Sequence, residues 1–155
     1  SRDCSSCEET VTVLAAAKAR AVAARHPEAI VIGADTAVTV DGHILGKPAG
    51  REEAQGMLRL LSGREHQVMS GVCVYREGRF LCECEITSVQ FRPLTDREID
   101  AYIDAEPPFD KAGAYGIQGL AALFIERING DYYTVMGLPL FRLGNLFKRL
   151  DIPLL

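Results

Sequence analysis

A single carboxylate follows a short apolar run near the start of the chain. Residues 29–34 read AIVIGA, and Asp35 comes directly after them. We expect the run to be a buried strand that ends at Ala34, with Asp35 at the ligand-binding edge of a sheet. A carboxylate placed there can hold a divalent metal or take a proton from water. It can equally close a turn through its own backbone, so position alone leaves both interpretations open.

Two lysines have surroundings that suit an anionic ligand. Lys47 lies between Gly46 and Pro48, where glycine allows close approach to the backbone and proline stiffens the segment that follows. Lys18 lies on an otherwise apolar stripe of a predicted helix, which can bury the alkyl stem and present the ammonium group. Each ammonium can act as a point charge toward a phosphate oxygen, although a solvated loop lysine is the simpler interpretation of Lys47.

A second group of polar residues occurs in the segment 106–119, which reads EPPFDKAGAYGIQG. Asp110 and Lys111 form an adjacent acid and base, and three glycines allow the backbone to pass close to a ligand. The amide of Gln118 offers both donors and an acceptor, so it can pair with the edge of a nucleotide base. Long loops with few bulky apolar residues are usually functional or mobile.

Periodicity and turn signals predict the elements that must position these residues. A capping box at Thr95–Glu98 marks a helix start, and Asp41-Gly42 between β-forming residues marks a hairpin. Helices are predicted at 8–26, 51–61, 96–105 and 137–150, strands at 29–34, 67–75, 79–91 and 120–128, and a hairpin over 36–45. Interleaved helices and strands with adjacent hairpins predict one α/β domain over 1–155, with a mixed, twisted β-sheet flanked by helices.

Composition excludes several classes of protein. The 155 residues are 48% hydrophobic and 25% charged, which is typical of a folded domain. A net charge of −4 provides no global basic field, so a nucleic acid polymer is not an expected partner. The sequence has no apolar stretch as long as a membrane span and no visible secretory signal, so we expect no membrane association and a cytoplasmic protein.

The cysteines and histidines are weaker candidates for chemistry. Cys4 and Cys7 form C-x-x-C, and Cys82 and Cys84 form C-x-C, so a zinc or redox site is conceivable. Reduced thiols in a cytosolic protein are the simpler interpretation of the five cysteines. His26, His43 and His66 form no plausible Ser-His-Asp set, and we expect each on the surface. Tyr132 and Tyr133 can stack on a base, but packing in the core or at a rim is the simpler expectation.

Taken together, these motifs resemble the Maf family of nucleoside triphosphate pyrophosphatases, first described as septum-formation inhibitors. The resemblance rests on GADT at 33–36, GKP at 46–48, LSGREHQVMSGV at 61–72, DKAGAYGIQG at 110–119 and NGDYYTVMGLPL at 129–140. It covers nearly all of the chain from Glu8 onward. It implies a Maf/inosine-triphosphatase-like fold and hydrolysis of a nucleoside triphosphate to monophosphate and pyrophosphate with a divalent metal, Mg or Mn.

The resemblance also implies roles for individual residues. Asp35 is similar to the family's catalytic proton acceptor or metal-linked carboxylate, and Asp110 to a second acid at the metal. Lys18, Lys47 and Lys111 are similar to the lysines that contact phosphates.

Two further positions are those associated with substrate choice. Thr36 and Gln118 resemble the subgroup that acts on dTTP and UTP, while a subgroup that acts on 7-methyl-GTP carries other residues there. A nucleoside triphosphate substrate, a role in nucleotide-pool house-cleaning and a homodimer are implied as well.

One departure from the family pattern concerns the start of the chain. Family members begin with a strand and an S-x-S-P-R-R segment, whose serine and arginines contact the triphosphate; a further acid follows before the first helix present here. Neither is found in these 155 residues, so we expect the domain to be N-terminally incomplete, with that strand and loop missing. An alternative to the pyrophosphatase is therefore a catalytically impaired nucleotide-binding or regulatory protein linked to cell division.

Overall fold

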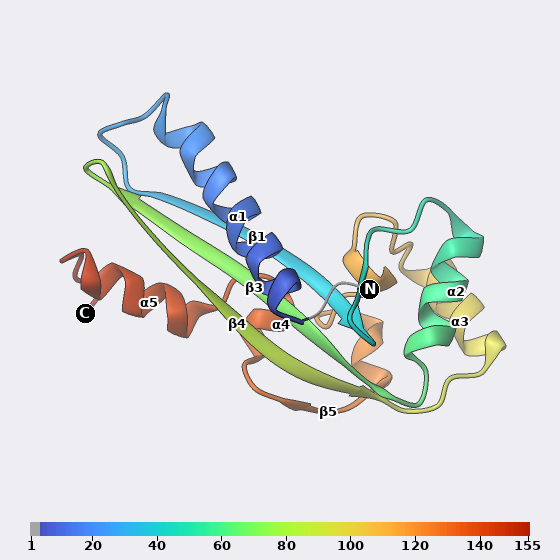
Figure 1. Ribbon diagram of the computed structural model, residues 1–155. Helices are drawn as coiled ribbons and strands as arrows, with labels where there is room; N and C mark the ends of the chain where they lie inside the picture. Colours follow the sequence, from blue (N-terminus) through green and yellow to red (C-terminus); the bar gives the residue numbers. More distant parts are fainter. Residues whose placement is uncertain (1–3) are drawn as a thin grey trace.

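A long antiparallel hairpin forms the centre of the structure, a computed structural model that describes residues 4–155, with side chains from Cys7 onward. The hairpin joins β3 (Glu65–Arg76) to β4 (Arg79–Phe91) through Glu77 and Gly78, which both adopt positive φ angles, 48° and 80°. Such left-handed residues give a two-residue turn the twist of its strands. β1 (Val31–Val40), β2 (His43–Leu45) and β5 (Ile125–Asn129) complete a five-stranded sheet in the order β2-β1-β3-β4-β5 (Figure 1).

The predicted α/β domain with flanking helices is confirmed, but the sheet is antiparallel at all four described pairings instead of mixed. The connection from β1 to β3 explains the difference. It passes through β2 and the helix α2 (Arg51–Leu61) and returns to the same end of the sheet, where Gln67 pairs with Thr39. A parallel neighbour requires a connection that crosses to the opposite end.

Helices cover both faces of this sheet. The helix α1 (Cys4–Ala23) lies across one face, and α4 (Tyr132–Met136) and α5 (Leu140–Arg149) pack on the other (Figure 1). α2 and α3 (Asp96–Ala105) pack together beside one end of the sheet, over a core of aliphatic and aromatic side chains that includes Leu58, Phe91 and Ile103. None of the helices within residues 4–155 is long and apolar enough to cross a membrane.

Several predicted boundaries were right and others were wrong. α2 and α3 occur at the predicted residues, and the capping box of Thr95 and Glu98 is present. The segment predicted as one strand at 120–128 instead begins with the 3₁₀ helix η2 (Leu120–Leu123) and enters the sheet only at Ile125. The helix predicted at 137–150 is preceded by α4, which ends at Gly137 with a left-handed φ of 115°.

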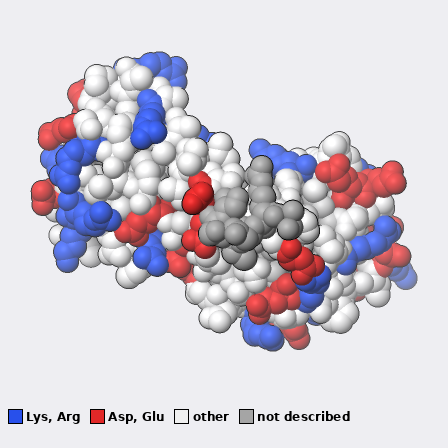
Figure 2. All heavy atoms as spheres, viewed as in Figure 1, with Lys and Arg blue, Asp and Glu red and all other residues white. Residues whose placement is uncertain are grey.

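The charged side chains are interspersed over the face that Figure 2 shows. Lysines and arginines alternate there with aspartates and glutamates over both lobes of that face. Several charged side chains of the described chain form ion pairs between elements, such as Arg51 with Asp104 at 2.6 Å and Arg142 with Glu85 at 2.7 Å. The charges that matter for a ligand are therefore those gathered inside a cavity.

Candidate active site

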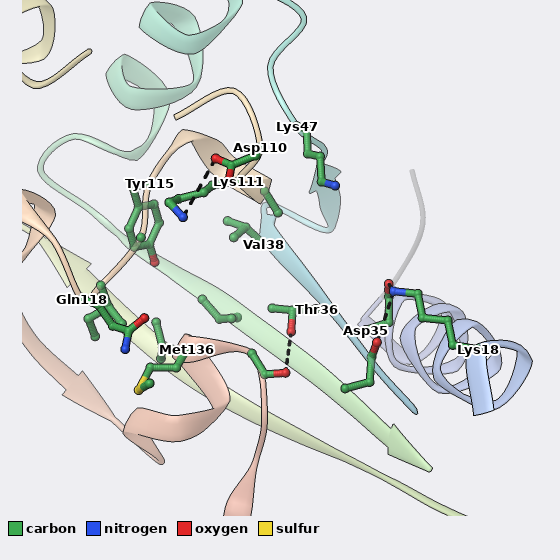
Figure 3. A pocket seen from close by; sticks show the side chains of 17 residues that line it. Lys18, Asp35, Thr36, Val38, Lys47, Asp110, Lys111, Tyr115, Gln118 and Met136 are labelled. Carbon is green, nitrogen blue, oxygen red and sulfur yellow. Dashed lines mark hydrogen bonds and ion pairs between the residues drawn. The ribbon is translucent and has the colours of Figure 1, made fainter. Parts of the chain in front are cut away.

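A cavity of about 360 Å³ lies at the edge of β1, between α1 and the loop that follows α3. Figure 3 shows the charged side chains at two sides of this cavity and Gln118 with Met136 at a third. The structure brings together all seven residues singled out in the sequence, and each lines the cavity: Lys18, Asp35, Thr36, Lys47, Asp110, Lys111 and Gln118.

Asp35 lies within a strand, so the expectation that β1 ends at Ala34 was wrong. β1 continues to Val40, and Asp35 pairs with Gly71 of β3. On the other edge β2 pairs only with Val38, Thr39 and Val40, which leaves the edge around Asp35 open within the described chain. Because side chains alternate along a strand, Asp35 and Thr36 point to opposite faces of the sheet. The cavity therefore wraps around the open edge and receives both side chains.

Two glycines place α1 directly against the strands below Lys18. A Cβ atom on Gly33 would lie 2.8 Å from the amide nitrogen of Ala19 and closer still to the carbonyl oxygen of Ala15. A Cβ atom on Gly71 would lie 2.5 Å from the carbonyl oxygen of Val11. The backbone of the helix occupies the space that larger residues would fill, and this close packing fixes the height of Lys18 above the sheet.

Lys18 reaches the cavity from this helix. Its ammonium nitrogen donates to Asp35 Oδ1 at 2.8 Å and to the carbonyl oxygen of Ala34 at 3.2 Å. The side chain of Asp35 is 20% exposed and that of Lys18 is 59% exposed, so the ion pair faces solvent and can rearrange around a ligand. An ammonium group has three N–H donors, which leaves one of them for an incoming anion.

The other two lysines form the opposite rim. The amide of Gly113 donates to the carbonyl oxygen of Gly46 at 3.1 Å, which ties the Gly46–Pro48 segment to the 110–119 loop. Lys47 and Lys111 are therefore carried by two segments that hold each other in place. Lys111 lies 4.0 Å from Asp110 and passes its alkyl chain over Gly116, where a Cβ atom would approach Lys111 Cδ to 3.0 Å.

A buried histidine fixes the loop that carries Lys111 and Gln118, and the expectation that His66 lies on the surface was wrong. His66 is fully buried, and its Nε2 lies 2.6 Å from the hydroxyl of Tyr115. Burial and the charge of Arg64 lower the pKa of His66 to about 4, so the imidazole is neutral near pH 7. His26 and His43 are exposed as expected.

Two residues at the end of α3 hold the same loop from behind. The hydroxyl of Tyr102 accepts a hydrogen bond from the amide of Gly116 at 3.4 Å. The carboxylate of Glu106 accepts from the amide of Leu120 at 3.0 Å. Burial raises the pKa of both Tyr102 and Tyr115, so both phenols stay protonated. The loop expected to be functional or mobile is thus anchored on both sides of Gln118.

The third side of the cavity is less charged. Gln118, Met136 and Gly137 line it together with Thr36, whose hydroxyl lies 2.7 Å from that of Ser70. Sequence reasoning missed Ser70 and His66, which share one face of β3 with Val68. Because β3 is buried on both faces from Val68 to Tyr75, no alternation in the sequence marks these two residues. Tyr132 and Tyr133 are partly exposed and are not among the described residues that line the cavity.

The donor set fits a hard divalent cation such as Mg²⁺ or Mn²⁺. Asp35 and Asp110 bring carboxylate oxygens to the cavity from opposite sides, and such oxygens are preferred ligands of these metals. The part of the chain that the structure describes contains no cluster of three or more His, Cys, Asp or Glu ligands. A metal at this cavity would be held by these one or two carboxylates together with phosphate oxygens and water.

None of the four cysteines whose side chains the structure describes lines this cavity. A disulfide joins Cys73 to Cys82, which face each other across β3 and β4, so the expectation of reduced thiols was wrong for this pair. Cys7 is a residue of α1 and is buried against the sheet. Burial raises the pKa of Cys84 to about 11, which makes its thiol a poor nucleophile. The side chain of Cys4, the other half of the C-x-x-C, lies outside the described residues.

Comparison with known proteins is consistent with this site. A dTTP/UTP pyrophosphatase of Symbiobacterium thermophilum is 53% identical over 146 residues, covering 94% of this chain and 75% of the relative. One of Bacillus velezensis is 50% identical over 145 residues, covering 94% and 77%. One of Thermococcus onnurineus is 60% identical over 110 residues, covering 71% and 60%. A family model described as Maf-like protein matches residues 2–150. The chain belongs to this Maf-like family.

Proposed function

We propose that this protein is an enzyme that hydrolyses dTTP and UTP to the nucleoside monophosphate and pyrophosphate. The observation that carries the proposal is the gathering of three lysines and two aspartates in one cavity, beside an uncharged side that holds Thr36 and Gln118. The relatives are dTTP/UTP pyrophosphatases, which supports both the reaction and the substrates. This likeness does not favour a 7-methyl-GTP substrate or a protein without turnover.

The charges of the cavity suit the triphosphate. Lys18 keeps one N–H donor free beside Asp35, and Lys47 and Lys111 approach from the opposite rim. Three lysines against two aspartates leave one net positive charge, which is less than a triphosphate requires. A divalent metal held by Asp35 and Asp110 would supply the remaining positive charge and stabilise the negative charge on the transferring and leaving oxygens.

Asp35 is placed to act on the attacking water. Its carboxylate projects into the cavity from a strand, and pairing with Gly71 holds its backbone, so its position depends little on loop motion. In the proposed reaction Asp35 takes a proton from a water molecule, and the water oxygen bonds to the α-phosphorus while the bond to the bridging oxygen breaks. Lys18, Lys47 and Lys111 then neutralise the departing pyrophosphate.

The uncharged side is assigned to the nucleoside. The amide of Gln118 can donate to and accept from a pyrimidine edge, and His66 and Tyr102 hold the loop that presents it. The homodimer implied by the resemblance and the cytoplasmic location expected from the sequence stay predictions.

Hydrolysis in ¹⁸O-labelled water, followed by mass spectrometry of the products, tests the reaction. Attack at the α-phosphorus places the label in dTMP or UMP and leaves pyrophosphate unlabelled. A labelled pyrophosphate, or release of orthophosphate with a nucleoside diphosphate, would contradict the proposal. Parallel reactions with 7-methyl-GTP and with a purine triphosphate test the preference for dTTP and UTP.

A further inference from the structure

A chain of hydrogen bonds runs from the nucleoside side of the cavity into the core. The hydroxyl of Thr36 on β1 lies 2.7 Å from the hydroxyl of Ser70 on β3. Ser70, which is fully buried, donates onward to the carbonyl oxygen of Thr134 at 2.8 Å. Thr36 also lies 3.4 Å from the carbonyl oxygen of Gly137. Three segments distant in sequence therefore meet at one serine.

The inner end of this series of hydrogen bonds, the carbonyl group of Thr134, is held firmly by its own helix. The Asp131 carboxylate accepts hydrogen bonds from the amide of Thr134 at 2.9 Å and from its hydroxyl at 2.7 Å, which caps α4. The Thr134 carbonyl oxygen accepts from the amide of Gly137 at 3.1 Å in addition to Ser70. A carbonyl oxygen has two lone pairs, and both are used here.

The protons of the chain can be assigned by counting. A hydroxyl group has one proton to donate, and a carbonyl oxygen can only accept. Either Ser70 donates its single proton to Thr134 and Thr36 donates in the 2.7 Å contact, or Ser70 donates to Thr36 and Thr36 donates to the Gly137 carbonyl. In both arrangements the single proton of Thr36 is used within the protein. The oxygen of Thr36 consequently offers only lone pairs to the cavity.

We propose that Ser70 is a positioning residue for substrate selection, which fixes the Thr36 hydroxyl as a hydrogen-bond acceptor for a donor group on the nucleoside. The inference rests on the proposed function of the cavity. Uracil and thymine carry an N–H donor at N3, whereas cytosine has a lone pair there and would face the lone pairs of Thr36. A sugar hydroxyl is a second possible source of the same donor. A site built around one hydrogen bond rejects a ligand that lacks the matching group.

Binding measurements with analogues that resist cleavage test this inference independently of turnover. Calorimetry gives the ratio of Kd values for α,β-methylene-UTP and α,β-methylene-CTP, in the presence of Mg²⁺. We expect wild type to favour the UTP analogue, and Thr36→Val and Ser70→Ala each to reduce that preference about tenfold, the worth of one neutral hydrogen bond. The double variant should lose no more than either single variant. Thr36→Ser, which keeps the hydroxyl, should behave as wild type.

Analogues of thymidine that have or lack the 3′-hydroxyl distinguish the two sources. If the preference for the 3′-hydroxyl falls in Ser70→Ala while the UTP-to-CTP ratio is unchanged, the sugar supplies the donor and the inference stands in that form. Equal weakening of every analogue, or fully additive losses in the double variant, would overturn it and leave Ser70 as a structural tie. If wild type shows the expected Kd ratio but hydrolyses no triphosphate, the proposed function alone is contradicted. No binding of any analogue would contradict both.

Discussion

Replacing Gly33 with alanine tests how α1 positions the site. The new methyl group would lie 2.8 Å from the Ala19 nitrogen and 3.0 Å from the Ala19 Cβ, where ordinary contacts are 3.4–4 Å. The Ala15 carbonyl oxygen lies closer still. Backbone atoms cannot rotate away as a flexible side chain can, so we expect α1 to move outward by roughly 1 Å.

The expected loss has two parts. Overpacking of this kind costs about 1–3 kcal/mol of unfolding free energy, and each kcal/mol lowers the melting temperature of a chain of this size by about 2–4 °C. The same movement would stretch the 2.8 Å contact between Lys18 and Asp35. Displacement of a positioned group by about 1 Å can cost on the order of 100-fold in rate, so kcat/KM for dTTP should fall by about that factor.

Thermal unfolding and pyrophosphate release, measured on the same samples, check this prediction. Gly56→Ala in α2 is the matched control, because its added methyl group would have no neighbour within 4 Å beyond the adjacent residues and the backbone of its own helix. The control should gain about 0.5–1 kcal/mol from lower backbone entropy of the unfolded chain and keep its activity. A Gly33→Ala protein with unchanged melting temperature and activity would refute the packing argument. One that is destabilised but fully active would refute the link from α1 to Asp35.

Three further predictions follow from the site. The pKa of His66 is about 4 in the folded protein and about 6.5 in the unfolded chain, so between pH 6.5 and pH 4 only the unfolded chain binds the proton. The unfolding free energy should therefore fall by about 3 kcal/mol as the pH drops from 6.5 to 4. Urea unfolding at several pH values measures this slope, and a His66→Gln variant that keeps the whole slope would contradict it. Gln118→Ala should reduce kcat/KM for dTTP and UTP about tenfold, the worth of one hydrogen bond, and should affect a purine triphosphate less. Equal losses of kcat/KM for all these substrates in steady-state assays would show that Gln118 does not recognise the base. Removal of divalent metal with EDTA should abolish pyrophosphate release, and addition of excess Mg²⁺ or Mn²⁺ should restore it. Activity that persists in EDTA would rule out metal binding by Asp35 and Asp110 as a requirement of the reaction.

The local parts of the fold could be predicted from the sequence because the signals that determine them are local. The capping box at Thr95 sets the start of α3, and Asp41-Gly42 and Glu77-Gly78 set two hairpin turns. The direction of the strands could not be predicted in the same way. It depends on where α2 returns the chain to the sheet, which no short segment specifies.

The candidate site was predicted as a set of residues but not as a geometry. The chemistry of Asp35, Lys47 and the 110–119 loop, with the family resemblance, identified side chains that all line one cavity. The sequence could not show that Asp35 lies within a strand. A charged side chain fits at this position of β1 because its partner on β3 is Gly71 and because β2 does not pair with β1 around Asp35. Ser70 was missed for a related reason, since its partners come from β1 and α4.

The most direct test of the account is the activity of Asp35→Asn beside that of Asp104→Asn. Asp104 is an exposed acid on α3, paired with Arg51 at 2.6 Å, and lies outside the residues that line the cavity. With dTTP and Mg²⁺, we expect Asp35→Asn to lose pyrophosphate release by at least about 100-fold while melting within a few degrees of wild type. Asp104→Asn should keep wild-type turnover. Near-normal turnover by a folded Asp35→Asn protein would contradict the central claim that this carboxylate activates the attacking water.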